Sequence, residues 1–245
     1  MLSTARITKP PKKGSAPAVQ NGTPPIPPLQ NGDHLTVAEF ERRYEAMPHV
    51  KKAELINGVV FMGSPVRMEY HADQHGSVVT WLGFYRAHTP GIQLGDNTSL
   101  KLEVGTNQPQ PDAALRILPE CGGISRTRKG YVIGAVELAV EVAASSVTYD
   151  LHEKLDEFER NGILEYLVWR VDEAEIDWFV LKSDKYQRLA QTKDGIFKSK
   201  VFPGLWLDPC ALIADDLIRM LDVVQQGIAS PEHQRFVKKL NYTKK

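Results

Sequence analysis

The spacing of apolar residues along the chain divides it into helices and strands. Thr36 and Glu39 form a capping box at the start of a helical pattern, and Asn57-Gly58 between two β-rich runs predicts a tight hairpin. Apolar residues repeat with helical spacing over 75–87, which predicts a second helix.

The rest of the chain alternates between short β-rich runs and helical segments. The expected elements are strands over 99–103, 112–117 and 136–142, a helix over 150–161 with Asp150 as its N-cap, strands over 165–171 and 176–182, a turn over 193–195, and helical segments from 213 onward. This order predicts the mixed α/β (α+β) class, with one sheet and helices packed on it.

The first 33 residues differ in composition from the rest of the chain. They are rich in Pro, Gly, Ser and Lys, so they cannot bury enough apolar surface to fold alone. We expect a disordered basic tail over 1–33, a folded domain over 34–216 and a C-terminal helical extension over 217–245. The tail is interpreted as a linker, with a weak nucleic-acid tether as the alternative.

Charge and cysteine content narrow the function classes. The chain has 30 Lys and Arg against 30 Asp and Glu, so no overall positive field draws it onto nucleic acid. The local exception is the basic run RTRKG at 126–130, which is expected in an exposed loop. Cys121 and Cys210 lack metal-binding spacing, no apolar stretch reaches the length of a membrane span, and the first residues lack the apolar centre of a secretory signal. We therefore expect a cytoplasmic protein.

The strand expected over 136–142 carries two glutamates among apolar residues. Alternation places Glu137 and Glu141 on one face of the strand and its valines and leucine on the other. A buried carboxylate is costly unless a metal ion or a lysine compensates its charge. The alternative is that this face is solvated and both glutamates are ordinary surface residues. The strand alone leaves both interpretations open.

A lysine and a second acid extend this pattern. Lys154 lies inside the apolar face of the helix expected over 150–161, from which it reaches either Glu141 or the solvent. Asp112 follows Pro111 at the start of a strand, although Pro-Asp is also a common turn dipeptide. Two carboxylates and a lysine form the set of a metal-dependent nuclease. The carboxylates hold Mg²⁺, the metal lowers the pKa of a bound water, and the lysine orients that water.

In these residues and their order, the sequence resembles the Uma family, whose members are inferred to be restriction endonucleases of the PD-(D/E)XK nuclease superfamily. The resemblance runs from about Thr36 to Asp216. Its pieces follow the family's order, which makes the set more specific than any single piece. They are ELINGVVFM at 54–62, a helix opening at His75, Pro111-Asp112, ELAVEV at 137–142, DLHEKLDEF at 150–158, GILEYLVWRVD at 162–172 and FPGLWLD at 202–208.

The resemblance implies a restriction-endonuclease-like core, with a central mixed sheet flanked by helices, and an endonuclease that cuts DNA with Mg²⁺ or Mn²⁺. It implies Asp112 and Glu141 as metal ligands and Lys154 as the catalytic lysine. In the superfamily's usual signature the lysine lies two residues after the acid, where this chain has Ala143. The family pattern moves the lysine onto the next helix, as here.

Glu54 and His75 match two further positions of the family. Glu54 is expected as a second metal or water contact, and its alternative is an acid on the surface of a hairpin. His75 is expected to contact phosphate or assist proton transfer, and its alternative is a structural role. The chain departs from the family's Ser-Pro-Ser with Ala144-Ser145-Ser146, which puts the geometry of that loop in doubt.

Other functions were weighed against the nuclease. A catalytically inactive nucleic-acid-binding or scaffold protein that keeps the fold is the main alternative, and the neutral charge balance favours it mildly. His71 and His75 stand four residues apart, but they lack the acid pattern of a zinc protease. A homodimer is expected by analogy with the superfamily.

Overall fold

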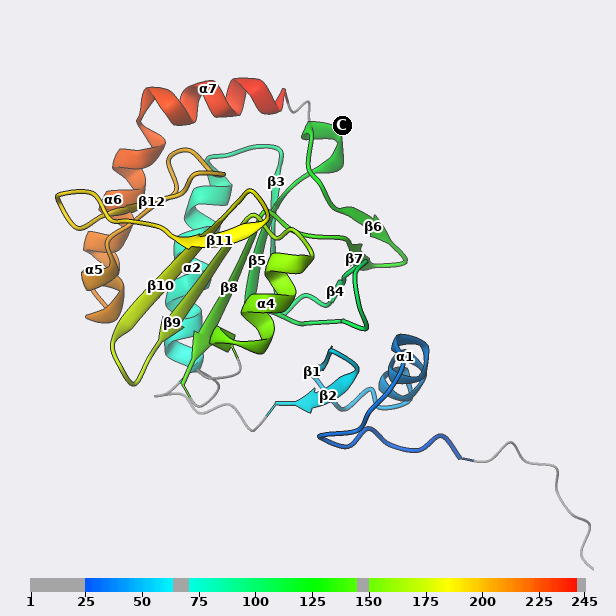
Figure 1. The fold of residues 1–245 in the computed structure, drawn as a ribbon. Coiled ribbons are helices and arrows are strands. Elements are labelled where there is room, and N and C mark those ends of the chain that lie inside the picture. The colour runs from blue at the N-terminus through cyan, green and yellow to red at the C-terminus, as the bar shows by residue number, and fades with distance from the viewer. Residues whose placement is uncertain (1–24, 64–70, 145–149, 242–245) are drawn as a thin grey trace, which may run out of the picture.

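A computed structural model describes residues 25–63, 71–144 and 150–241 of the chain (Figure 1). Its first half contains α1 (Val37–Glu45), β1 (Ala53–Ile56), β2 (Val59–Met62), α2 (Ala72–Ala87), β3 (Ile92–Asp96), β4 (Leu100–Lys101), β5 (Ala113–Ile117), the short 3-10 helix η2 (Pro119–Cys121), β6 (Arg126–Arg128), β7 (Tyr131–Ile133) and β8 (Leu138–Ala143). Its second half contains α4 (Glu153–Arg160), β9 (Glu165–Arg170), β10 (Glu175–Lys182), β11 (Lys185–Arg188), β12 (Phe197–Lys198), β13 (Trp206–Leu207), α5 (Pro209–Ile213), α6 (Leu217–Ile228) and α7 (Pro231–Leu240).

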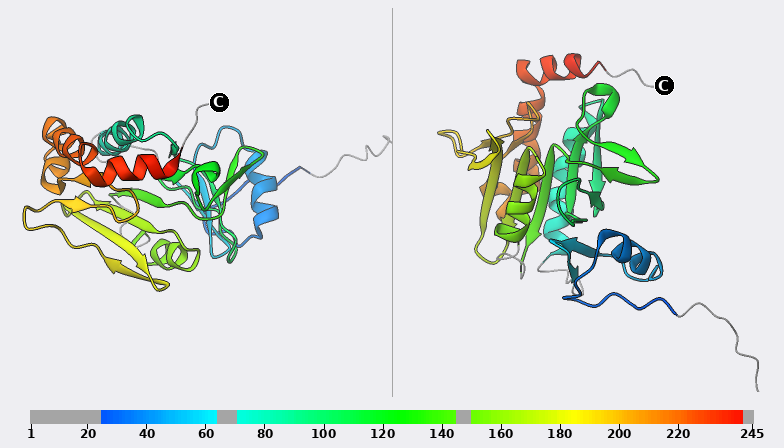
Figure 2. Two further views of the ribbon diagram at one scale, coloured as in Figure 1. Left: turned by 90° about the horizontal axis from the view of Figure 1, so that it is seen from above. Right: turned by 45° about the vertical axis from the view of Figure 1, so that its right-hand side comes forward.

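A six-stranded sheet in the order β11-β10-β9-β8-β5-β3 forms the centre of the molecule. The β8–β9 pair is parallel and the other neighbours are antiparallel, so the sheet is mixed. Helices α2 and α6 cover one face and α4 covers the other, as the view from above shows (Figure 2). The predicted mixed α/β class, with one mixed sheet flanked by helices, is confirmed.

Strand β8 is buried on both of its faces. Its even-numbered residues, such as Val140, join the core formed with α2 and α6, while Ala139 and Ala143 join the core under α4. Glu137 and Glu141 are only 1% and 3% exposed. The interpretation of these glutamates as solvated surface residues is therefore wrong.

The N-terminal elements form a small unit with its own apolar cluster around Phe40. The Thr36 hydroxyl accepts the Glu39 N–H at 3.3 Å, so the capping residue starts α1 as predicted. Asn57 and Gly58 both have positive φ angles, 50° and 78°, which a two-residue turn between β1 and β2 requires. The predicted helix and hairpin are confirmed.

Several element boundaries differ from the expectations. Helix α2 begins at Ala72, so His75 lies in its first turn and does not open it. The strand expected over 99–103 shrinks to two residues, β4. The run RTRKG does not form a plain loop: it forms β6 and the turn into β7, because 126–128 pairs with 131–133.

Strand β3 was not expected, because its sequence IQLGD has neither alternation nor a β-branched run beyond Ile92. Its antiparallel pairing with β5 stabilises this strand, although its own sequence does not predict one. Asp150 was expected to cap the next helix, but α4 begins at Glu153, with His152 at the N-cap position. Asp150 instead contacts a lysine side chain, as described below.

The C-terminal segment forms three helices, separated by short breaks at 214–216 and 229–230. Met220 and Val224 of α6 are buried in the same core as α2. The domain limits predicted at residues 33 and 216 stay predictions. Among the described residues, none of the helices is long and apolar enough to cross a membrane.

A pH dependence of stability follows from Glu165, which is fully buried on β9. Burial raises its pKa from 4.5 to about 7, although hydrogen bonds from Ser199 and the Lys200 and Val201 backbones oppose the shift. The folded state therefore holds this proton more tightly than the unfolded chain does. We expect this group's contribution to the free energy of unfolding to fall by about 3 kcal/mol as the pH rises through this interval.

Urea unfolding of the native protein and of Glu165→Gln at a series of pH values tests this expectation. In the variant, the free energy of unfolding should no longer show this fall with pH, because the amide does not ionise. Glu153→Gln, on the surface of α4, should keep the native slope. An unchanged slope in Glu165→Gln would contradict the assignment.

Candidate active site

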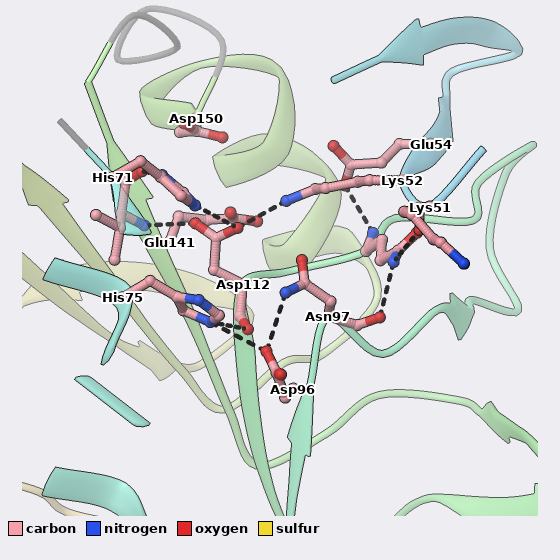
Figure 3. Close-up of polar contacts among 12 residues, drawn as sticks. Lys51, Lys52, Glu54, His71, His75, Asp96, Asn97, Asp112, Glu141 and Asp150 are labelled. Atoms are coloured by element: carbon pink, nitrogen blue, oxygen red, sulfur yellow. Dashed lines mark hydrogen bonds and ion pairs between the residues drawn. The ribbon is translucent and has the colours of Figure 1, made fainter. Parts of the chain in front are cut away.

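Asp112 and Glu141 meet where β5 begins beside β8. The pairing of Ala113 with Val140 places Asp112 next to Glu141 on the adjacent strand. Asp112 is 2% exposed, and its Oδ2 accepts the Val142 N–H at 2.8 Å. Both carboxylates thus lie at one end of the central sheet, on the face that α4 covers (Figure 3).

The peptide groups of Val142 face the side of β8 where β5 has already ended. The Glu137 and Ala143 carbonyls bond to β9, so the residues at even positions direct their N–H and C=O groups toward β5. Beyond Asp112, no strand among the described residues pairs with them on this side. The Val142 N–H therefore binds the Asp112 carboxylate, and its C=O accepts from His71 Nδ1 at 3.0 Å.

The ammonium group of Lys154 lies at the centre of a buried acidic cluster. Its Nζ lies 2.7 Å from Glu141 Oε1, 3.0 Å from Glu54 Oε1 and 3.5 Å from Asp150 Oδ1. Its side chain is only 2% exposed. The alternative interpretation in which Lys154 reaches the solvent is therefore wrong. The interpretation of Glu54 as a surface acid is wrong as well, because Glu54 is 6% exposed.

Lys52, the residue immediately before β1, is a second cation in the same cluster. Its Nζ lies 2.7 Å from Asp112 Oδ1 (Figure 3). Burial alone would lower the pKa of Lys52, but the charges of Glu141, Asp112 and Glu54 more than offset this and raise it. Burial would raise the pKa of Asp112, yet Lys52, His71 and the Val142 N–H hold it below its ordinary value.

Glu141 has the opposite electrostatic environment. Burial, together with the nearby charges of Asp112 and Asp150, raises its pKa well above the ordinary value, although Lys154 and Lys52 oppose the shift. The two carboxylates on neighbouring strands therefore differ in proton affinity. Additional positive charge at this site would favour the ionised form of Glu141.

The donor set is suited to a divalent cation. Four carboxylates and two ammonium groups are linked by ion pairs: Glu54, Asp112, Glu141, Asp150, Lys52 and Lys154. Fully ionised, the cluster has two more negative than positive charges. Within the described ranges, no group of three or more His, Cys, Asp or Glu residues is gathered as a ready metal site. Two carboxylates and a peptide carbonyl are nevertheless a sufficient protein contribution for Mg²⁺, which keeps several waters.

His75 lies beside this cluster and contacts the backbone of Asp112, not its carboxylate. Its Nε2 lies 2.9 Å from the Asp112 carbonyl oxygen and 3.1 Å from Asp96 Oδ1. The rings of His71 and His75 stack with 5.8 Å between their centroids. Both histidines therefore connect the first turn of α2 to the acidic end of the sheet.

The structure brings together all five residues that the sequence singled out, Glu54, His75, Asp112, Glu141 and Lys154. Sequence reasoning missed Lys52 and the contact of Asp150 with Lys154, and it considered His71 only as a zinc ligand. Lys52 sits two residues before Glu54, so strand alternation from Glu54 was the signal that could have found it. The departure at Ser145 and Ser146 lies outside the described residues.

Loss of the central lysine should destabilise the fold strongly. Lys154→Met leaves Glu141 buried without its closest cation, so we expect the free energy of unfolding to fall by roughly 3 to 5 kcal/mol. The double variant Lys154→Met with Glu141→Gln should recover part of that loss. Urea unfolding measures each difference.

The matched control is Lys185→Met, which breaks the exposed pair between Lys185 and Glu159 and should change stability little. A loss in Lys154→Met no larger than in this control would contradict the role of Lys154 as the counter-charge of the cluster.

Comparison with known proteins identifies the family and supports the fold. The family model Uma2, described as "Putative restriction endonuclease", matches residues 37–210, which is well over half of the chain. No match was found among curated proteins. A solved structure described as a "putative nuclease belonging to DUF820 from Anabaena variabilis ATCC 29413" matches with a TM-score of 0.56 and 14% sequence identity, covering 74% of this chain and 98% of that chain. The restriction-endonuclease-like fold implied by the sequence resemblance is thereby confirmed, and the chain belongs to the Uma2 family.

Proposed function

We propose that this protein is a metal-dependent endonuclease that hydrolyses phosphodiester bonds in DNA. The observation that carries the proposal is the buried contact of Lys154 with Glu141, next to Asp112 on the paired strand. Membership of a family described as restriction endonucleases supports the nuclease class. The metal, the substrate and the roles of single residues are the proposal's own content.

Asp112, Glu141 and the carbonyl group of Val142 are the groups that would hold Mg²⁺ or Mn²⁺. All three lie at the same end of β5 and β8, and the cluster's excess negative charge supports a divalent cation there. When bound, such an ion lowers the pKa of a water ligand and offsets negative charge on the phosphoryl group.

Lys154 is the residue that would orient the attacking water. It is held by Glu141 and Glu54 from two different strands, so its ammonium group has a fixed position. Lys52 reaches the site from the residue before β1 and contacts Asp112. Its raised pKa keeps it charged near neutral pH, so it can stabilise the negative charge that develops on the phosphate.

His75 has a positioning role in this proposal. Its contact with the Asp112 carbonyl oxygen anchors the residue that leads into β5. Its second contact, to the exposed Asp96 carboxylate, leaves it at the edge of the site. A direct contact of His75 with phosphate therefore needs Asp96 to release it.

Cleavage of supercoiled plasmid and of linear DNA tests the activity. The native protein should cut with Mg²⁺ or Mn²⁺ and not with EDTA, and Glu141→Gln and Asp112→Asn should each reduce the rate by at least about a hundredfold. The matched control is Glu137→Gln on the same strand and face, whose carboxylate instead binds the Ile117 and Ile124 N–H groups. Equal cleavage by native protein and Glu141→Gln would overturn the assignment.

Metal binding separates the enzyme from a non-catalytic DNA-binding protein with the same fold. Calorimetric titration with Mn²⁺ should show binding to the native protein and to Glu137→Gln, and a loss of binding in Glu141→Gln. Salt-dependent DNA affinity without metal binding and without cleavage would instead support the non-catalytic alternative.

A further inference from the structure

A second feature of the sheet, outside the acidic cluster, is a pocket of about 350 Å³ between β3, β5 and the small sheet β4-β7-β6. Its volume lies in the range of small-molecule sites. Arg116 and Ala114 from β5 line it on one side, and Thr127 and Val132 from the β6–β7 hairpin line it on the other. The hairpin stands beside the edge of the main sheet in both views of Figure 2.

Arg116 is a buried cation whose hydrogen-bond acceptors are all neutral. It is 7% exposed and binds the Gln93 amide oxygen at 2.7 and 3.0 Å, the Thr127 hydroxyl at 2.7 Å and the Ser125 hydroxyl at 3.3 Å. Within the described part of the chain, it makes no ion pair. Burial lowers the pKa of its guanidinium, which the more distant Glu137 and Glu120 only partly oppose. Since a buried charge is costly without a partner, this one lacks the anion that would stabilise it.

The pocket has one polar wall and one apolar wall. Thr127 is exposed and lines the pocket together with Gly130, so the β6–β7 hairpin supplies a polar wall next to Arg116. Val132 and Val136 are buried and form an apolar wall. An anionic group beside a flat apolar body fits this combination, as in a nucleoside phosphate.

The pocket and the proposed active site lie along the same strand, β5. Asp112, Ala114 and Arg116 alternate onto the same face at the start and along β5, so Arg116 lies about 13 Å from Asp112. That span corresponds to a few nucleotides, since B-DNA advances about 3.4 Å per nucleotide. Asp96 lines the end of the pocket nearest the site, but its carboxylate is turned to His75 on the other face of the sheet.

We propose that this pocket binds one nucleotide of the strand that lies in the active site, with Arg116 and Thr127 holding its phosphate group. The proposal rests on the proposed function for the identity of its ligand. The phosphate would give the buried guanidinium the charged partner that it lacks, by taking the place of the neutral Gln93 and Ser125 oxygens that accept its N–H groups in this structure.

The test is the affinity of the full-length protein for a fluorescein-labelled single-stranded DNA hexanucleotide, measured by anisotropy in EDTA at fixed salt. We expect Arg116→Gln to weaken binding by about tenfold or more, because it removes a charge-assisted bond to phosphate. Thr127→Val keeps the shape and the charge and should weaken binding several-fold. Because Thr127 lies on the surface, this second variant still tests the pocket if Arg116→Gln does not fold.

The matched control is Arg126→Gln, which also replaces an arginine by glutamine. Arg126 precedes Thr127 in the sequence, and its side chain pairs with the exposed Glu103. It should change the affinity by less than about twofold. Equal weakening by Arg116→Gln and Arg126→Gln would show a general charge effect and overturn the pocket. Unchanged binding in Arg116→Gln and Thr127→Val would overturn it as well.

Because binding is measured without metal, its outcome is separate from cleavage. If the native protein does not cut DNA but Arg116→Gln and Thr127→Val weaken binding, the nucleotide pocket stands and the nuclease proposal fails. If Glu141→Gln abolishes cleavage but both pocket variants bind and cut as the native protein does, the nuclease stands and the pocket fails.

Discussion

The structure depends on the burial of one ammonium group among acids from different parts of the chain. Lys154 reaches from α4 to Glu141 on β8, to Glu54 on β1 and to Asp150. The small N-terminal unit is thus joined to the central sheet through charge. Since an isolated buried charge is far less stable than a paired one, displacing any of these segments would expose the others to a large electrostatic penalty.

The same burial separates the two carboxylates of the site electrostatically. Lys52, His71 and a peptide N–H hold Asp112 in its ionised form, while burial favours the protonated form of Glu141. In the proposed enzyme, Asp112 would therefore already be ionised to bind a metal ion, whereas Glu141 would ionise as the positive charge approached. Such tuning of neighbouring acids is a general property of functional sites.

The sequence indicated residues that the fold brings together, and it predicted the fold class, but it did not predict every strand of the sheet. Glu141 and Lys154 could be found because an acid in an apolar strand and a lysine on an apolar helix face are unusual, whereas Asp112 was found from Pro-Asp at a strand start and from its company with the other two. Strand β3 could not, since its sequence has almost no β signal and its stability comes from pairing with β5. Alternation from Glu54 could have pointed to Lys52, but not to its partner Asp112, which is 60 residues away in sequence. The contact of Asp150 with Lys154, four residues apart, was missed because Asp150 was interpreted as a helix N-cap.

The unequal lengths of β5 and β8 have a consequence for how this site tolerates change. Because β5 starts at Ala113 while β8 continues to Ala143, the peptide group of Val142 is left to bind Asp112 and His71. Any residue other than proline keeps this backbone contribution, so the Val142 side chain is otherwise constrained only by the apolar core it enters. Inserting or deleting residues at the start of β5 would, by contrast, shift the acid away from that peptide. The position of the site thus depends on the relative lengths of two strands. It is therefore less sensitive to a change of the Val142 side chain than to an insertion or deletion at the start of β5.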